Sequence, residues 1–204
     1  MKTIVLVDGQ NLYHLARELW APTPHIGGSP YGYPCYDVEK LADALVKKDT
    51  QRTLSEIRFY TGVPDPKENY FWHGFWNNKL RYLTGRGIHV YRGRINPGGQ
   101  EKGVDVSLAI DLIRLTYEHA YDVAIIVSQD WDFGPAIALA KRIAKDQKRY
   151  LQFFSAFPYD TNLSRTRRGI PGTTWIHIER TLYDSCFDQT DYRPMPKGGK
   201  QGSR

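Results

Sequence analysis

In Thr3-Ile4-Val5-Leu6-Val7-Asp8-Gly9-Gln10-Asn11, a short apolar run ends at an aspartate and a turn. A second stretch, Val123-Ala124-Ile125-Ile126-Val127-Ser128-Gln129-Asp130-Trp131-Asp132, repeats the pattern. Short apolar, β-branched runs bounded by turn residues are typical of strands buried on both faces of a parallel sheet. The two stretches therefore predict two central strands, each followed directly by carboxylates.

Helical and extended patterns alternate through the rest of the chain. The expected helices are residues 11–19, 38–48 with Asp37 as N-cap, 70–84, a helix from 104, and 133–144. The further expected strands are residues 57–61, 88–91, 150–154 and 174–178. Alternation of helices with buried strands predicts an α/β fold, a three-layer, Rossmann-like sandwich around a mainly parallel central sheet.

The 204 residues suit one domain, which we expect to span residues 1–183. The segment from about residue 20 to residue 36 is rich in Pro, Gly and Tyr, which predicts a loop insertion. Residues 93–103 predict a polar loop. The final segment, residues 184–204, is expected to be a flexible basic tail.

The composition indicates a globular protein of the cytoplasm. The chain is 41% hydrophobic and 13% aromatic, and no apolar run approaches the roughly 20 residues that span a bilayer. Met1-Lys2-Thr3 lacks the layout of a secretory signal. Cys35 and Cys186 are too few for a disulfide framework and lack metal-ligand spacing. We expect no membrane partner, and the sequence leaves a homo-oligomer open.

The net charge of +6 is unevenly distributed. Residues 135–204 carry 13 Lys and Arg against 6 Asp and Glu, whereas residues 1–134 carry 15 against 16. An acidic site beside a basic surface is what an enzyme acting on nucleic acid requires, although basic surfaces also serve solubility alone.

The aspartates that follow the two strands predict a metal site. Ligands of parallel sheets gather outside the carboxyl ends of the strands, so Asp8 and the pair Asp130 and Asp132 face one edge. Asp105 precedes the apolar helical positions 108, 109 and 112, which places it on an inward-facing stripe. Clustered carboxylates repel one another unless a cation or a shared proton compensates. Together with the amide of Asn11, they match a Mg²⁺ or Mn²⁺ site.

Each of these residues also has a simpler interpretation. Asp105 could be an ordinary first-turn acid favoured by the helix dipole. Asp132 could be the N-cap of the helix that starts at Phe133. Asp8 and Asn11 could form an ordinary turn. Asp111, six positions beyond Asp105, is predicted to be a solvated residue on another face of the helix.

Three segments resemble the NYN domain, a branch of the PIN-like ribonucleases: Val7-Asp8-Gly9-Gln10-Asn11-Leu12, Lys102-Gly103-Val104-Asp105-Val106 and Val127-Ser128-Gln129-Asp130-Trp131-Asp132-Phe133. The likeness covers roughly residues 1–155, with the motifs in the family's order. It implies a metal-dependent ribonuclease with a PIN-like fold. It also implies an acidic set made of Asp8, Asp105, Asp130 and Asp132, with Asn11 as polar companion. The sequence departs from the family at Gln129 and Trp131, where Gly and Ser are usual.

Basic residues outside the acidic set predict a substrate surface. Arg165, Arg167 and Arg168 lie in a loop rich in Gly and Pro, and arginine makes bidentate contacts with phosphate. Lys102 precedes the helix of Asp105 and could contact a phosphate as well. A merely solvated loop is the alternative for the arginines.

Aromatic residues are concentrated between positions 70 and 76. Tyr70 and its neighbours Phe71, Trp72, Phe75 and Trp76 could stack on unpaired bases. The helical spacing of the last four favours packing in the core instead. His14 and His73 are interpreted as structural, with acid–base chemistry as the alternative.

These features predict a metal-dependent endoribonuclease. Water activated by Mg²⁺ or Mn²⁺ at the aspartate cluster would cleave RNA phosphodiester bonds. Asp8, Asp105, Asp130, Asp132 and Asn11 are the expected catalytic residues, and RNA is the expected partner. One rival is an RNA-binding module of the same fold without turnover. The other is a phosphatase or DNA nuclease that uses the same acidic edge.

Overall fold

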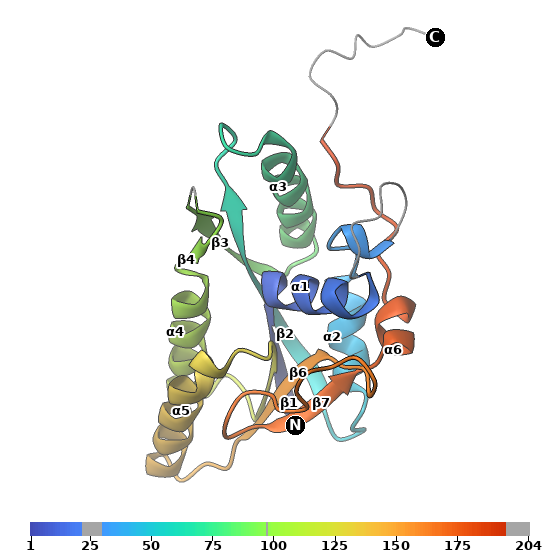
Figure 1. The fold of residues 1–204 in the computed structure, drawn as a ribbon. Coiled ribbons are helices and arrows are strands. Elements are labelled where there is room, and N and C mark those ends of the chain that lie inside the picture. Colours follow the sequence, from blue (N-terminus) through green and yellow to red (C-terminus); the bar gives the residue numbers. More distant parts are fainter. Residues whose placement is uncertain (22–29, 97, 195–204) are drawn as a thin grey trace, which may run out of the picture.

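A seven-stranded sheet forms the centre of the molecule in a computed structural model that describes residues 1–21, 30–96 and 98–194 (Figure 1). Its strand order is β4-β3-β2-β1-β5-β6-β7. The strands are β1 (Lys2–Asp8), β2 (Thr53–Pro64), β3 (His89–Ile95), β4 (Glu101–Lys102), β5 (Val123–Val127), β6 (Gln152–Pro158) and β7 (Thr174–Ile178). Every neighbouring pair is parallel except β3 and β4. The predicted mainly parallel sheet is confirmed, with β1 at its centre.

Helices cover both faces of this sheet. The first face carries α1 (Gly9–Trp20), α2 (Val38–Val46), α3 (Tyr70–Gly85) and α6 (Arg180–Ser185), and the second carries α4 (Val104–Tyr117) and α5 (Gly134–Asp146). Val5 and Val7 of β1 belong to the core under the first face, and Ile4 and Leu6 belong to the core under the second. Side chains of a strand alternate in this way, so both faces of β1 are buried. The predicted three-layer α/β sandwich is confirmed.

The register of the central strands places two loops side by side. Val7 of β1 pairs with Val127 of β5, so the two strands end at the same level. α1 begins directly after β1, and a short 3₁₀ helix, η2 (Trp131–Phe133), follows β5. The carboxylates that follow these strands therefore emerge at the same edge of the sheet.

Four strands differ from the expected pattern. β3 and β6 end at Ile95 and Pro158, four residues beyond the predicted strands 88–91 and 150–154. β2 covers Thr53–Pro64 instead of residues 57–61, because it pairs with β1 along its first half and with β3 along its second. β4 lies inside the expected loop 93–103 and folds back on β3, with Lys102 opposite Arg94. A strand of two residues is too short to show a periodic signal in the sequence.

The loop insertion and the start of α2 follow the prediction in part. Asp37 caps α2 as expected, since its Oδ1 accepts hydrogen bonds of 3.0 Å from the backbone N atoms of Glu39 and Lys40. Within the expected loop 20–36, residues 30–32 form a 3₁₀ turn, Tyr31 and Tyr36 are buried, and residues 22–29 lie outside the described residues.

The segment after α6 is packed, although we expected a flexible tail from residue 184. Cys186 and Tyr192 are buried. Asp188 accepts a hydrogen bond of 2.6 Å from Tyr192 and forms an ion pair of 3.4 Å with Lys79 of α3, which is itself fully buried. Residues 184–194 therefore belong to the folded domain, and residues 195–204 lie outside the described part of the chain. No helix in the described ranges has both the length and the apolar character needed to cross a membrane.

Candidate active site

Asp8 is the most deeply buried of the predicted site acids, with 3% of its surface exposed. It ends β1 and caps α1: its Oδ1 accepts from the backbone N of Asn11 at 3.0 Å, and its Oδ2 accepts from Ser128 Oγ at 3.2 Å. Burial raises the pKa of Asp8 to about 7, and the charges of Asp105 and Asp130 add to this effect. A buried carboxylate of this kind is stabilised by any cation placed beside it.

Asp130 and Asp132 occupy the turn after β5. The backbone N of Asp130 donates to Ser128 Oγ at 3.1 Å, and Asp130 Oδ1 accepts from the backbone N of Asp132 at 2.9 Å. Asp130 therefore caps η2, while Phe133 stands at the N-cap of α5 without a side-chain hydrogen bond. The capping role that we considered for Asp132 belongs to Asp130. Ser128 links this turn to Asp8.

Asp105 lies in the first turn of α4, beside the other acids. Gly103 precedes the helix with φ of 83°, a left-handed conformation that glycine adopts without strain. Partial burial raises the pKa of Asp105, and the charges of Asp130 and Asp132 raise it further. Leu108 and Leu112 are buried as predicted, whereas Asp105 itself stays largely exposed at the end of their stripe. The electrostatic coupling places Asp105 in one group with the acids of β1 and η2.

Glu101 is a member of this acidic group that the sequence did not reveal. It lies on β4, and its Oε1 accepts a hydrogen bond from the backbone N of Gly62. Burial raises the pKa of Glu101 to about 7, with contributions from the charges of Asp8 and Asp105. A side chain at position 62 would collide with Glu101, because a Cβ there would lie 2.6 Å from Oε1. Glycine at this position of β2 is the one local signal that such a close neighbour exists.

Asn11 connects the start of α1 with the turn after β5, so its side-chain oxygen is already engaged and does not offer a further metal ligand. Its Oδ1 accepts from the backbone N of Gln129 at 3.1 Å. Gln129 in turn donates from Nε2 to the carbonyl O of Arg168 at 2.9 Å, so this departure from the family pattern ties the acidic edge to the basic loop. Asn11 thus positions the turn that carries Asp130.

The five carboxylates suit a hard divalent cation in their chemistry. Oxygen ligands of this type are preferred by Mg²⁺ and Mn²⁺. Burial, with a further contribution from the charges of neighbouring acids, raises the pKa of three of them, Asp8, Glu101 and Asp105. Within residues 1–21, 30–96 and 98–194, however, no group of three or more His, Cys, Asp or Glu side chains is arranged to hold an ion. The donors are neighbours, and binding an ion requires their side chains to turn towards a common point.

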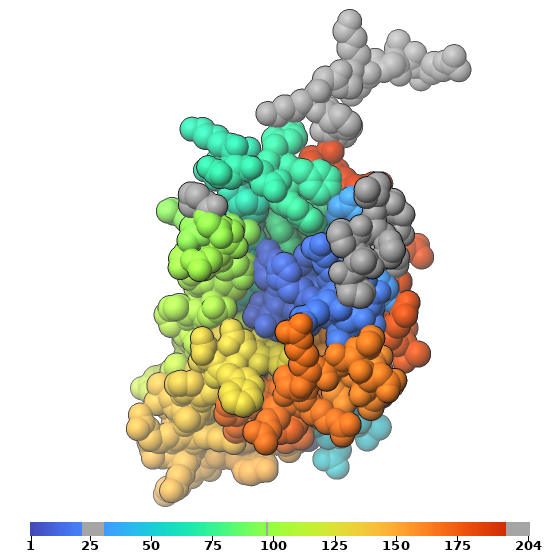
Figure 2. Space-filling model, viewed as in Figure 1, coloured from blue at the N-terminus to red at the C-terminus, as the bar shows by residue number. Residues whose placement is uncertain are grey.

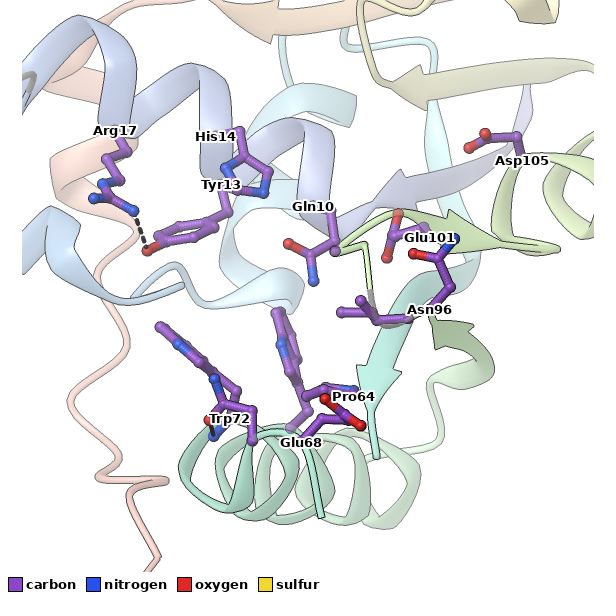
Figure 3. A pocket seen from close by; sticks show the side chains of 14 residues that line it. Gln10, Tyr13, His14, Arg17, Pro64, Glu68, Trp72, Asn96, Glu101 and Asp105 are labelled. Carbon is purple, nitrogen blue, oxygen red and sulfur yellow. Dashed lines mark hydrogen bonds between the residues drawn. The ribbon is translucent and has the colours of Figure 1, made fainter. Parts of the chain in front are cut away.

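A cavity of about 640 Å³ opens beside Glu101 and Asp105 (Figure 3). One wall comes from α1 with Gln10, Tyr13, His14 and Arg17, and the opposite wall comes from the start of α3. The remaining lining residues are Pro64, Glu68, Asn69, Trp72, Trp76, Ile95, Asn96 and Gly99. The cavity therefore extends from the acidic group to an aromatic and polar region.

The predicted basic residues lie on the surface around this edge. Lys102 is exposed on β4 next to Glu101, and Arg167 and Arg168 are exposed in the loop between β6 and β7. Arg165 forms an ion pair of 3.4 Å with Glu18 of α1, although its side chain is 90% exposed. In Figure 2 the surface of α1, in blue, lies between the green β4–α4 region and the orange loop. The loop thus borders α1.

Some of the aromatic residues and histidines have structural roles, and others line the cavity. Phe75 and Trp76 are buried in the core as expected, whereas Trp72 is partly buried and lines the cavity. His73 Nδ1 lies 2.8 Å from the carbonyl O of Pro64, which agrees with a structural role. His14 instead lines the cavity.

Asp111 is not the solvated residue that we expected. Its Oδ2 accepts from Arg58 Nη1 at 2.9 Å and from Tyr60 Oη at 2.8 Å, and its Oδ1 accepts from Arg114 at 3.1 Å. These contacts fasten α4 to β2. The periodic pattern of one helix contains no information about the strand beneath it, so this role was not predictable.

Comparisons with known proteins agree with this architecture. The sequence model of the NYN domain matches residues 2–156. No curated protein matches the chain. A crystal structure of a protein of unknown function from Vibrio parahaemolyticus RIMD 2210633 has a TM-score of 0.54 and 19% sequence identity, and the match covers 88% of this chain and 93% of that one. At this identity the likeness shows a shared fold alone. Because the family match spans most of the chain and includes all five acids, the protein belongs to the NYN domain family.

Proposed function

We propose that the protein is a metal-dependent endoribonuclease that cleaves RNA with single-stranded character. The NYN domain has a PIN-like nuclease fold, and the proposal adds the metal ion and the substrate. The observation that carries it is the gathering of five carboxylates from three parts of the chain at one edge of the sheet. There, burial and repulsion raise the pKa of both Asp8 and Glu101 to about 7.

The proposed ligands of Mg²⁺ or Mn²⁺ are Asp8, Glu101, Asp105, Asp130 and Asp132. Such an ion, when bound, supplies the charge that lowers the pKa of water and offsets negative charge on the phosphate. Ser128 and Asn11 position the acids. Ser128 forms hydrogen bonds with both Asp8 and Asp130, and Asn11 accepts a hydrogen bond from the backbone N of Gln129, in the turn after β5.

Phosphate binding is assigned to the basic residues at the rim. Arg165 pairs with Glu18 of α1, Arg167 and Arg168 are exposed in the same loop, and Lys102 directly follows Glu101 in the sequence. Trp131 is 51% exposed between Asp130 and Asp132, where an unpaired base has an aromatic surface to stack on. These features support a strand with unpaired bases as the substrate.

An RNA-binding module without turnover is the second candidate. The observation in its favour is that the carboxylates in the described part of the chain do not converge on a single ion position. In this case the acidic edge would limit where the RNA backbone passes, and the basic loop would supply affinity.

The test is cleavage of a panel of single-stranded, hairpin and duplex RNAs with Mn²⁺ or Mg²⁺, with and without chelator. Matched DNA strands and a phosphomonoester complete the panel, and Asp105→Asn protein, prepared identically, controls for contaminating nucleases. We expect cleavage of unpaired RNA that is lost with chelator and in the variant. RNA affinity without cleavage would select the binding module, and preferential turnover of DNA or the phosphomonoester would overturn RNA as the substrate.

A further inference from the structure

We propose that the cavity between α1 and α3 binds one unpaired nucleobase of the RNA strand, an inference that rests on the proposed function. The cavity measures about 640 Å³, which lies within the usual range of small-ligand sites. Its two walls face each other in Figure 3, with Gln10 and His14 on one side and Trp72 and Glu68 on the other.

The charges of the lining residues favour a neutral base over a phosphate group. The cavity contains three carboxylates, those of Glu68, Glu101 and Asp105, against one guanidinium, that of Arg17. Because Glu101 and Asp105 are assigned to the metal ion, the rest of the lining offers a phosphate only Arg17, with Glu68 of opposite charge also in the lining. A base carries no charge at neutral pH, and its amino groups can donate hydrogen bonds to a carboxylate. The exposed arginines of the loop between β6 and β7 suit the backbone phosphates outside the cavity.

Trp72 is the stacking surface of the proposed subsite. Its ring is held by edge-to-face contacts with neighbouring rings, with centroid distances of 5.3 Å to Phe75 and 5.5 Å to Phe71. The ring of Tyr13 on α1 contacts Trp72, with centroids 6.1 Å apart and an interplanar angle of 54°, so a base would stack on Trp72 beside this ring pair and not between the two rings. Asn69 caps α3 by accepting from the backbone N of Trp72 at 3.1 Å, which holds this residue in place. A ring positioned in advance stacks on a base at little entropic cost.

The polar side chains of α1 that line the cavity can form hydrogen bonds with a bound base. Gln10 Nε2 donates to the carbonyl O of Gly62 at 3.5 Å, a long hydrogen bond that a base edge can replace. Partial burial and the charge of Arg17 lower the pKa of His14, so at neutral pH its ring offers one donor and one acceptor. The wall therefore presents both kinds of hydrogen-bonding group.

The position of the cavity fixes the base relative to the cleaved bond. Glu101 and Asp105 belong both to the cavity lining and to the acidic group. A nucleotide whose base enters the cavity therefore has its own phosphate next to the carboxylates. The base must consequently lie at one constant offset from the scissile phosphate.

The experiment measures binding of short single-stranded RNAs in which each position in turn lacks its base. It uses Asp130→Asn protein to slow cleavage, combined with Trp72→Leu, with Gln10→Ala and His14→Ala together, or with Trp175→Leu. Trp175, a control on β7, is 44% exposed and absent from the cavity. We expect one abasic position to weaken binding on the order of tenfold. Trp72→Leu should weaken binding of intact RNA and remove this sensitivity, the Gln10 and His14 pair should reduce it, and the control should keep it.

Two results would overturn the base pocket. One is equal affinity for every abasic RNA, and the other is a sensitivity that persists unchanged in both cavity variants. Cleavage of the same RNAs by the unsubstituted protein with Mn²⁺ is measured in parallel. Cleavage without a sensitive position rejects the pocket and leaves the nuclease proposal standing. A sensitive position without cleavage retains the pocket and rejects the nuclease proposal.

Discussion

Asp130 shows how one residue serves structure and chemistry together. Its Oδ1 caps η2 through the backbone N of Asp132, and its carboxylate charge contributes to the repulsion felt by Asp8 and Asp105. An asparagine keeps the oxygen that caps the turn but lacks the negative charge. The two roles can therefore be separated by a single substitution.

Asp130→Asn should lower the rate of RNA cleavage by more than about 100-fold. Substituting a residue that only hydrogen-bonds to a metal ligand typically costs about 10- to 100-fold in activity, and loss of a direct ligand should cost more. The melting temperature without metal should stay the same or rise, because repulsion among the acids is relieved. Asp146→Asn, at an exposed position at the end of α5, is the matched control. A variant that melts early while its folded fraction cleaves normally would show that Asp130 is purely structural.

The raised pKa of Asp8 predicts how stability depends on pH. Its pKa is about 7 in the fold against 3.8 ordinarily, so the folded state binds this proton more tightly than the unfolded state. The resulting stabilisation is complete below the ordinary value and is lost as pH rises through about 7. Without metal, Asp8→Asn should therefore gain about 1–4 kcal/mol relative to the unsubstituted protein between pH 5 and pH 7.5. Urea unfolding at both pH values measures this, and parallel pH profiles would contradict it.

At the scale of elements, the loop between β6 and β7 brings basic residues to the acidic edge. Replacing Arg165, Arg167 and Arg168 by Ala should weaken RNA binding and reduce the salt slope by about 1–3, because fewer counterions are released. Arg142, Lys145 and Lys148 on or just after α5 form a matched control of equal charge. Binding is measured over a range of salt concentrations. An unchanged slope in the loop variant would remove this loop from the path of the RNA.

α3 fastens the segment after α6 through a buried lysine. Lys79 Nζ donates to the carbonyl O atoms of Pro34 and Tyr36 at 2.9 and 2.8 Å, and it pairs with Asp188. Burial lowers the pKa of Lys79 to about 8, with the charge of Asp188 opposing this shift. This one side chain in the middle of α3 therefore contacts two other segments, residues 34–36 before α2 and Asp188 after α6.

Lys79→Met should destabilise the protein by about 3–5 kcal/mol, because it leaves the buried carboxylate of Asp188 without its cation. Urea unfolding gives the loss, and limited proteolysis should detect earlier cleavage within residues 186–194. Lys47→Met, which removes an exposed partner of Asp43, should cost less than about 1 kcal/mol. Equal losses in the two variants would show that the buried contacts are not what holds this segment.

For the molecule as a whole, the sequence predicted correctly those strands and site residues that a local pattern of apolar residues reveals. β1 and β5 were predictable because both faces of each strand are apolar, and Asp8 and Asp130 followed because parallel strands end at a shared edge. Glu101 was missed because β4 exists only through its pairing with β3. The packing of Tyr192 was missed because most of its partners, Phe75, Lys79 and Tyr82, lie on α3, more than 100 residues away in the sequence.

Metal binding should be visible in the stability of the entire domain. Millimolar Mn²⁺ should raise the melting temperature by about 5–10 °C at neutral pH, since a ligand at about 100 times its Kd stabilises by about 2.7 kcal/mol. Chelator should reverse the shift, and Asp8→Asn and Asp130→Asn should reduce it strongly. An equal shift in all three proteins would place the bound ion elsewhere on the molecule.

The central position of β1 has a consequence for the synthesis of the protein. β1 needs β2 on one side and β5 on the other, so a growing chain that ends before residue 123 has Asp8, Glu101 and Asp105 but neither the second neighbour of β1 nor Asp130 and Asp132. A ribosome that translates this chain therefore carries an incomplete acidic site until more than half of the polypeptide has emerged. If the proposed nuclease activity is correct, this topology delays its onset beside the messenger RNA that encodes the protein.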